Sequence, residues 1–171
     1  MKKLLIFLIF LPLIGCNNIL KNKQAVDNFN CPRIFFSSED RVFIDTIANG
    51  SSIDDVMLKA KLNNFAILEK CHQKNNIAII PLDILIISQP MDKFEDADIS
   101  MPLYAILLDQ KNEVLETQYF MVLGSVKKNF ENNVFIETDI SYRLKIITEN
   151  LNTAEIVIGF MIDDKKRLLI N

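Results

Sequence analysis

Residues 134–146 alternate between mainly apolar and polar side chains, and this alternation limits what the chain can fold into. The first set is Val134, Ile136, Thr138, Ile140, Tyr142, Leu144 and Ile146, and charged or polar residues hold most of the positions between them. A period of two places one set on a buried face and the other in solvent. The pattern is typical of a half-buried antiparallel strand, so it predicts β-structure here.

Residues 56–62 repeat the alternation, with Val56, Leu58 and Leu62 on the inward side. After Asn63-Asn64 the apolar positions change parity to Phe65. One extra residue in a strand reverses the faces of everything that follows it. We therefore predict a β-bulge at Asn63 or Asn64.

Several other stretches have the character of strands. Residues 77–87 and 103–108 are apolar on both faces, as expected of strands in the middle of a sheet, and residues 114–123 and 154–162 also qualify. Pro81 conflicts with a central position, because proline cannot donate to a ladder. No stretch shows a sustained helical period. The sequence predicts an all-β fold, an antiparallel β-sandwich of about seven strands over residues 31–171.

The N-terminus has the features of an export signal. Lys2 and Lys3 precede an apolar run over residues 4–14, which is shorter than the ~20 residues that a membrane span needs. Leu13-Ile14-Gly15-Cys16 resembles the lipobox of bacterial lipoproteins. The resemblance implies cleavage of residues 1–15 and attachment of acyl chains to Cys16. The alternative is an ordinary signal peptide that happens to contain Cys16.

Residues 16–30 are polar and rich in Asn and Lys, so we interpret them as a lipidated flexible tether with a reach of ~20 Å. Asn17 does not match the Asp that retains enterobacterial lipoproteins in the inner membrane. By that resemblance we expect a protein anchored in the bacterial envelope and facing the periplasm, in the outer membrane rather than the inner.

The remaining cysteines, Cys31 and Cys71, form an even pair once Cys16 carries lipid. Because exported proteins meet an oxidising compartment, we predict a disulfide between them. Two free buried thiols or half of a metal site are the rival interpretations. His72 is the only histidine and no C-x-x-C spacing is present, so the sequence favours neither zinc nor another metal.

Four short motifs of the body resemble a group of uncharacterised alphaproteobacterial lipoproteins. They are Cys31-Pro32, Cys71, residues 102–109 (PLYAILLD) and residues 157–160 (VIGF). The resemblance implies an envelope location and an immunoglobulin-like β-sandwich over residues 31–162. It supplies no catalytic residue.

Candidate chemistry is sparse. Removal of residues 1–15 leaves 17 basic against 22 acidic residues and changes the net charge from −3 to −5, which argues against nucleic acid as a partner. His72 could serve a Ser-His-Asp site, but no G-x-S-x-G accompanies it. Asp92, Glu95, Asp96 and Asp98 could bind calcium, but the Gly turn of such loops is missing. We expect a solvated connector there, and no cofactor.

These observations favour a function without catalysis. The leading hypothesis is a lipid-anchored envelope accessory or protein-interaction module, with a membrane and an envelope protein as partners and self-association as an option. The alternative is a small apolar or lipidic ligand between the sheets, in a pocket lined by residues such as Ile80, Leu82, Tyr104 and Phe120. A hydrolase that uses His72 is the third hypothesis.

Overall fold

The computed structural model describes residues 27–48, 50–131 and 134–170. Its strands are β1 (Asp27–Asn28), β2 (Arg33–Phe36), β3 (Val42–Thr46), β4 (Val56–Ala66), β5 (His72–Lys74), β6 (Ile77–Pro90), β7 (Ala97–Leu108), β8 (Val114–Val126), β9 (Phe130–Glu131), β10 (Val134–Phe135), β11 (Thr138–Thr148) and β12 (Glu155–Phe160). A 3₁₀ turn, η1 (Ile53–Asp55), precedes β4, and a one-turn helix, α1 (Asp164–Arg167), follows β12.

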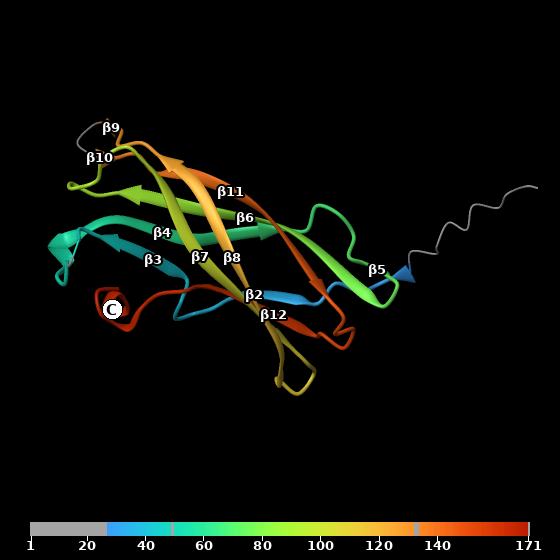
Figure 1. The fold of residues 1–171 in the computed structure, drawn as a ribbon. Coiled ribbons are helices and arrows are strands. Elements are labelled where there is room, and N and C mark those ends of the chain that lie inside the picture. The colour runs from blue at the N-terminus through green and yellow to red at the C-terminus, as the bar shows by residue number, and fades with distance from the viewer. Residues whose placement is uncertain (1–26, 49, 132–133, 171) are drawn as a thin grey trace, which may run out of the picture.

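Two sheets form the sandwich, and β9 with β10 forms a separate two-stranded hairpin (Figure 1). Sheet A is built around β6, which pairs with β11 on one side and with β4 and β5 on the other. The sheet continues from β4 to β3 and from β5 to β1. Sheet B has the order β2-β12-β7-β8. All pairs are antiparallel except β2 with β12. In Figure 1, β7 and β8 cross over the strands of sheet A.

The inner faces of the two sheets enclose one apolar core. Alternate residues of β4, β6 and β11 meet alternate residues of β7, β8 and β12, as the period of two requires. The fully buried side chains include Leu62, Ile80, Leu82, Ile84, Ile86, Met101, Leu103, Leu107, Leu144 and Phe160. The predicted all-β antiparallel sandwich is confirmed.

The strand order could not be derived from the pattern. β3 and β4, the second and third strands of four residues or more, pair within sheet A, whereas an immunoglobulin domain places its second and third strands in different sheets. Residues 27–48, 50–131 and 134–170 include eight strands of four residues or more, close to the expected seven.

The β-bulge predicted near Asn63 is confirmed. Leu62 is in register with Ile86 and Asn64 with Leu85, so one residue of β4 is left without an opposite partner. Arg41 holds the bulge, because its guanidinium donates to the carbonyl oxygens of Leu62 and Asn63 at 2.8 and 3.1 Å.

Pro81 lies in the central strand β6, at a position where no neighbouring strand on one side requires a backbone N–H donor. It is in register with Lys145 of β11. On the opposite side, β4 ends at the pair Ala66–Asp83 and β5 begins at the pair His72–Ile79. The proline therefore occupies the gap between two successive neighbours of β6, which reconciles it with a central strand.

One sequence expectation was wrong. Residues 134–136 do not continue β11 inward, because Val134 and Ile136 are 62% and 41% exposed and Val134 belongs to the short β9–β10 hairpin. The pattern in residues 154–162 correctly predicted β12, and residues 168–170 form turns after α1. Asp163 caps α1, accepting from the backbone N–H of Lys166 at 2.9 Å, and this cap starts a helical turn.

The predicted disulfide joins Cys31 and Cys71, whose Cα atoms are 5.2 Å apart. Cys71 directly precedes β5, which pairs with β1. Residues 27–31 are thereby held to sheet A by one short ladder and one covalent bond. Figure 1 shows this end of the sandwich opposite the end that carries β9 and β10.

Candidate functional site

The outer face of sheet B is the most distinctive surface of the described chain. Cross-strand register places Tyr104 opposite Tyr119 and Pro102 opposite Met121. Tyr119, Met121 and Leu123 of β8 are 66%, 51% and 71% exposed. We define the outer face of sheet B by nine residues that lie on the same side of β2, β7, β8, β12 and the residue that follows β12. They are Phe35, Pro102, Tyr104, Ile106, Tyr119, Met121, Leu123, Val157 and Met161.

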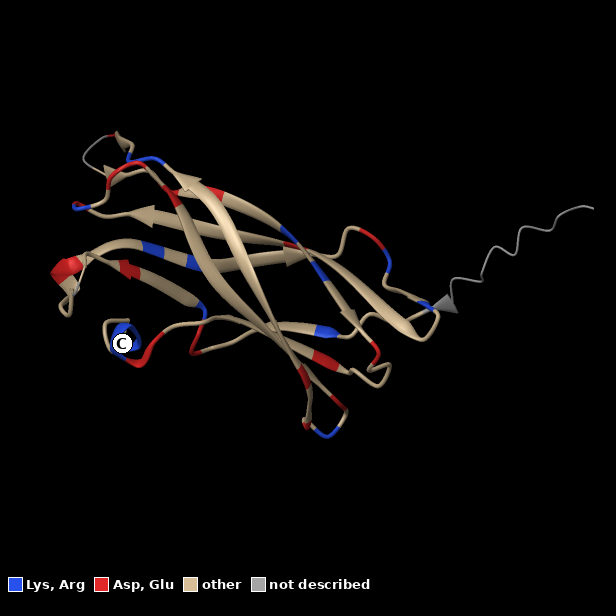
Figure 2. Cartoon of the chain, viewed as in Figure 1, with Lys and Arg blue, Asp and Glu red and all other residues tan. Residues whose placement is uncertain are grey.

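This outer face carries almost no charge. The ion pair of Arg33 with Glu155 lies at one end and Asp98 at the other. Figure 2 shows β8 without a blue or red segment along most of its length. The outer face of sheet A is different, since Lys59, Lys145 and the pair Arg143–Asp83, 3.0 Å apart, project from it.

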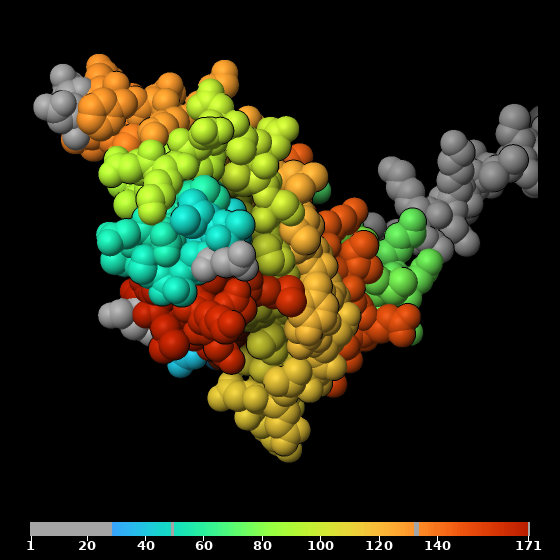
Figure 3. Space-filling model, turned by 60° about the vertical axis from the view of Figure 1, so that its left-hand side comes forward, coloured from blue at the N-terminus to red at the C-terminus, as the bar shows by residue number. Residues whose placement is uncertain are grey.

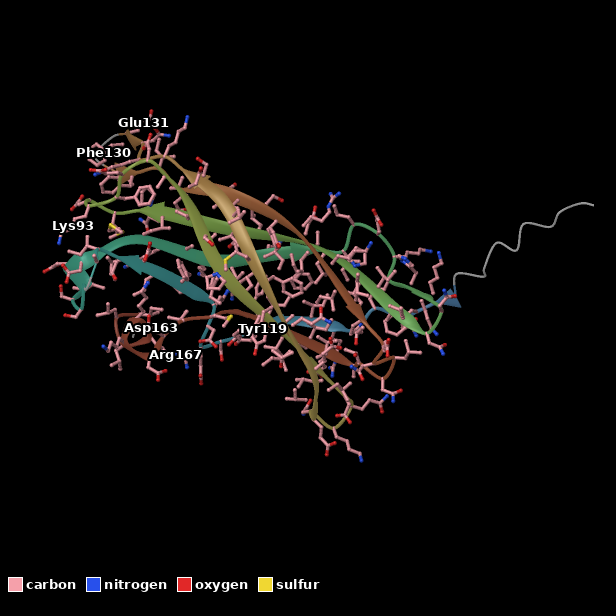
Figure 4. The ribbon with its side chains drawn as sticks, in the orientation of Figure 1. Lys93, Tyr119, Phe130, Glu131, Asp163 and Arg167 are labelled. Carbon is pink, nitrogen blue, oxygen red and sulfur yellow. A yellow bond between two sulfur atoms is a disulfide. The ribbon has the colours of Figure 1, made fainter. Side chains whose placement is uncertain are left out.

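A groove of about 730 Å³ opens on the outer face of sheet B. Tyr104 and Pro102 of β7 form its floor, Tyr119 of β8 lies along one wall, and residues 160–167 form the other wall. Figure 3 shows the red C-terminal segment and the yellow β8 on either side of β7. Figure 4 shows Asp163 and Arg167 on the C-terminal wall and Tyr119 on β8.

A buried carboxylate fixes the C-terminal wall of the groove. Asp40 accepts a hydrogen bond from Tyr104 Oη at 2.7 Å, and Arg167 Nη2 lies 2.8 Å from its other oxygen. Burial raises the pKa of Tyr104, and the carboxylate of Asp40 beside it adds to the effect. A tyrosine held in its neutral form and hydrogen-bonded to a carboxylate that also faces Arg167 is suited to position the wall of the groove.

Gly159 allows Tyr104 to lie flat on sheet B. The two residues are opposite each other on β12 and β7, and a Cβ at position 159 would approach Tyr104 Oη to 2.5 Å. Any larger side chain would displace the ring from Asp40. The floor of the groove therefore depends on a glycine in the middle of a strand.

A second polar cluster joins the edges of the two sheets. Glu116 of β8 accepts from Thr148 Oγ1 at 2.6 Å, from Gln118 at 2.7 Å and from Asn150 at 3.0 Å. Burial opposes ionisation of Glu116, but these three donors outweigh it and lower the pKa of the carboxyl. Glu116 therefore stays a charged acceptor that ties β8 to β11.

The structure does not bring the candidate catalytic and metal residues together. The ring of His72 has Nδ1 3.2 Å from the carbonyl oxygen of Lys70, and Cys71 beside it is bonded to Cys31. Asp96 accepts from the backbone N–H of Lys128 at 2.8 Å. Within residues 27–48, 50–131 and 134–170, no group of three or more His, Cys, Asp or Glu is arranged to hold a metal ion.

The four residues expected to line a ligand pocket between the sheets are separated. Ile80 and Leu82 are buried in the core, and Phe120 packs against it. Tyr104 points to the opposite side of sheet B, into the groove. A ligand site is therefore better placed on the outer face than between the sheets.

The expected lipidation site Cys16, the expected signal peptide over residues 1–15 and residues 16–26 of the expected tether lie outside the described residues. In the part of the chain that is described, no helix is long and apolar enough to cross a membrane.

Comparison of the chain with models of protein families, with curated proteins and with solved structures finds no match in any of the three. The site must therefore be interpreted from its own geometry. Sequence reasoning missed Asp40 and Arg167. The only signal was an acidic pair, Glu39-Asp40, before a strand and a basic triplet, Lys165-Lys166-Arg167, near the C-terminus, and neither pattern indicates a contact.

Proposed function

We propose that this chain is a lipid-anchored envelope protein that faces the periplasm and acts as a non-catalytic interaction module. The observation that carries the proposal is the uncharged, apolar outer face of sheet B. Monomeric proteins rarely expose contiguous apolar patches of this kind, and such patches commonly mark a contact with a partner.

The partner that fits this face is another envelope protein with an uncharged apolar surface. Three side chains project from alternate positions on one face of β8, namely Tyr119, Met121 and Leu123. A partner would therefore bury all three at once. Outside the C-terminal wall of the groove, which carries Asp163 and Arg167, charged partners would find only Asp98 and the self-paired Arg33 and Glu155. The absence of competing charge on the face makes shape and apolar area the basis of recognition.

The anchor is supported by sequence. Leu13-Ile14-Gly15-Cys16 resembles a lipobox, and β1 with the Cys31–Cys71 disulfide marks where the tether joins the body. An anchor at this end would hold one end of the sandwich near the membrane. The outer face of sheet B would then remain open to the periplasm along its side.

We expect the substitution Cys16→Ser to release the protein from membranes. Stable anchoring needs more than one lipid chain, and without the thiol no chain can be attached there. The measurement is fractionation of the producing cells followed by mass spectrometry of the mature N-terminus. Asn17→Ser, which leaves the thiol in place, is the control and should remain in the membrane fraction. Equal membrane retention of both variants would remove the anchor from the proposal.

We expect a photo-crosslinking amino acid at position 123 to capture one envelope protein in living cells. Leu123 is the most exposed of the three β8 residues that define the face, so a bound partner must approach it. The control is the same group at position 145, where Lys145 projects from the outer face of sheet A. Equal capture from both positions, or no protein adduct from position 123, would contradict the proposal.

A small apolar or lipidic ligand is a second candidate, favoured by the volume of the groove. About 730 Å³ is within the range of sites for small molecules, and its walls include Tyr119 and Met161. The same crosslinking group at position 119, which lines the groove, separates the two candidates. Lipid adducts at position 119 in place of a protein adduct would support this second function.

A further inference from the structure

Strand β12 forms backbone pairs with only half of the neighbouring strand β7. Its six residues pair with β7 from Leu103 to Leu108. One more contact follows, from the N–H of Met161 to the carbonyl oxygen of Pro102 at 2.9 Å, and the chain then turns away into α1. On this side, no strand of the described chain pairs with residues 97–101 of β7, which we call the open edge.

The open edge has backbone groups available for pairing. The carbonyl of Pro102 points to this side, because it accepts from Met161. Backbone N–H and C=O groups alternate from one side of an antiparallel strand to the other, so Asp98 and Ser100 direct theirs the same way. Neither residue has a backbone hydrogen-bond partner on this side within the described ranges. Both residues are exposed.

An apolar pocket lies beside the open edge. It measures about 590 Å³, and Phe43, Met57, Phe94 and Ile99 are among the residues that line it. Strand-forming peptides place alternate side chains on opposite faces. A peptide that pairs with Ser100 would thus direct every second side chain toward this pocket.

The rim of the pocket is acidic. Two of its charged residues are neutralised, since Asp45 lies 3.1 Å from Lys166 Nζ and Lys93 Nζ lies 3.3 Å from Asp55. Glu95 and Asp98 are exposed and form no ion pair with the described residues. A basic residue in the bound segment would meet these two carboxylates.

We propose that the open edge of β7 binds an extended segment of a partner protein by strand addition. The segment pairs with the backbone of Asp98 and Ser100, places an apolar side chain in the pocket beside Phe43 and Ile99, and carries a basic residue toward Glu95 and Asp98. Backbone pairing provides affinity in this mode, and the pocket provides selectivity. A second copy of the chain fits poorly, because two acidic rims would face each other.

The sharpest test is the pair of substitutions Ser100→Pro and Ser100→Ala. Proline removes the N–H at the open edge and blocks strand addition, but it leaves the ladder to β8 intact because that N–H points away from β8. Alanine keeps the N–H. The purified protein is used to select binders from a random library of nine-residue peptides displayed on phage. The dissociation constant of each synthetic binder is then measured for the three proteins.

We expect selected peptides with alternating apolar residues and at least one basic residue. The dissociation constants of these peptides should be at least about tenfold higher for Ser100→Pro than for the wild-type protein. For Ser100→Ala they should be unchanged. Amide hydrogen exchange followed by NMR gives a measurement independent of the variants: bound peptide should slow exchange at Ser100 and Asp98 and leave Tyr119 unaffected. This measurement decides the matter if Ser100→Pro does not fold.

Three results would overturn the inference. They are a selection without binders, binders that Ser100→Pro retains with full affinity, and protection located at Tyr119 and Leu123 instead of the open edge. Concentration-dependent dimerisation of the free protein that Ser100→Pro abolishes would assign the edge to a second copy and also reject a partner segment. None of these results depends on the lipid anchor, and protection at the open edge is distinguished from protection on the outer face of sheet B.

Discussion

Replacing Cys31 and Cys71 together by alanine is expected to lower the free energy of unfolding by about 4 kcal/mol. The bond closes a loop across a sequence separation of 40 residues, and opening it returns that much conformational entropy to the unfolded chain. In urea, the midpoint should fall by about 2 M for a slope near 2 kcal/mol/M.

The double substitution avoids the free thiols that reduction alone would leave. Treatment of the wild-type protein with a reducing agent is the parallel measurement, and the same agent should have no effect on the double variant. A change in stability below about 1 kcal/mol would show that β1, β5 and their neighbours hold the N-terminal end of the body without the covalent bond.

Phe160→Ala is expected to cost about 3–5 kcal/mol. Phe160 ends β12, is fully buried, and its ring centroid lies 5.6 Å from that of Phe43 in sheet A. Truncation removes a contact between the two sheets and leaves a cavity that neither sheet can close. Chemical denaturation of the folded protein measures the loss.

Phe35→Ala is the matched control, with the same change of side chain on neighbouring strand β2. Phe35 is on the outer face of sheet B and 44% exposed, so its truncation should cost less than about 1 kcal/mol. Equal losses from both substitutions would contradict the assignment of an inner and an outer face to sheet B. The control also tests the outer face as a surface that stability does not require.

Local patterns were sufficient for most of the strands. The alternation in residues 134–146 correctly predicted β11 from residue 138 onward, and the change of parity after Asn63-Asn64 located the bulge in β4. These predictions succeed because a strand has a period of two, and an inserted residue shifts every later side chain to the other face. The same alternation failed at Val134 and Ile136, where a short hairpin leaves the sheet.

The candidate site could be predicted only in part. Tyr104 was singled out as a pocket residue, but on the wrong side of its sheet. Residues 102–108 are apolar at both parities, so their pattern cannot tell the core side from the outer side. The contact of Asp40 with Tyr104 spans 64 positions, and that with Arg167 spans still more, so no local pattern reveals either.

By itself, the sequence determined that this chain would fold into strands, where one of them would bulge, and which two cysteines would pair. Each of these depends on neighbours along the chain or on the even count of cysteines that remains if Cys16 carries lipid. Tertiary structure alone decided which strands lie side by side, which apolar face of sheet B remains uncovered, and that β12 stops short of the full length of β7. Strand pairing brings together residues far apart in sequence, so its outcome depends on the whole set of competing contacts and not on any single stretch.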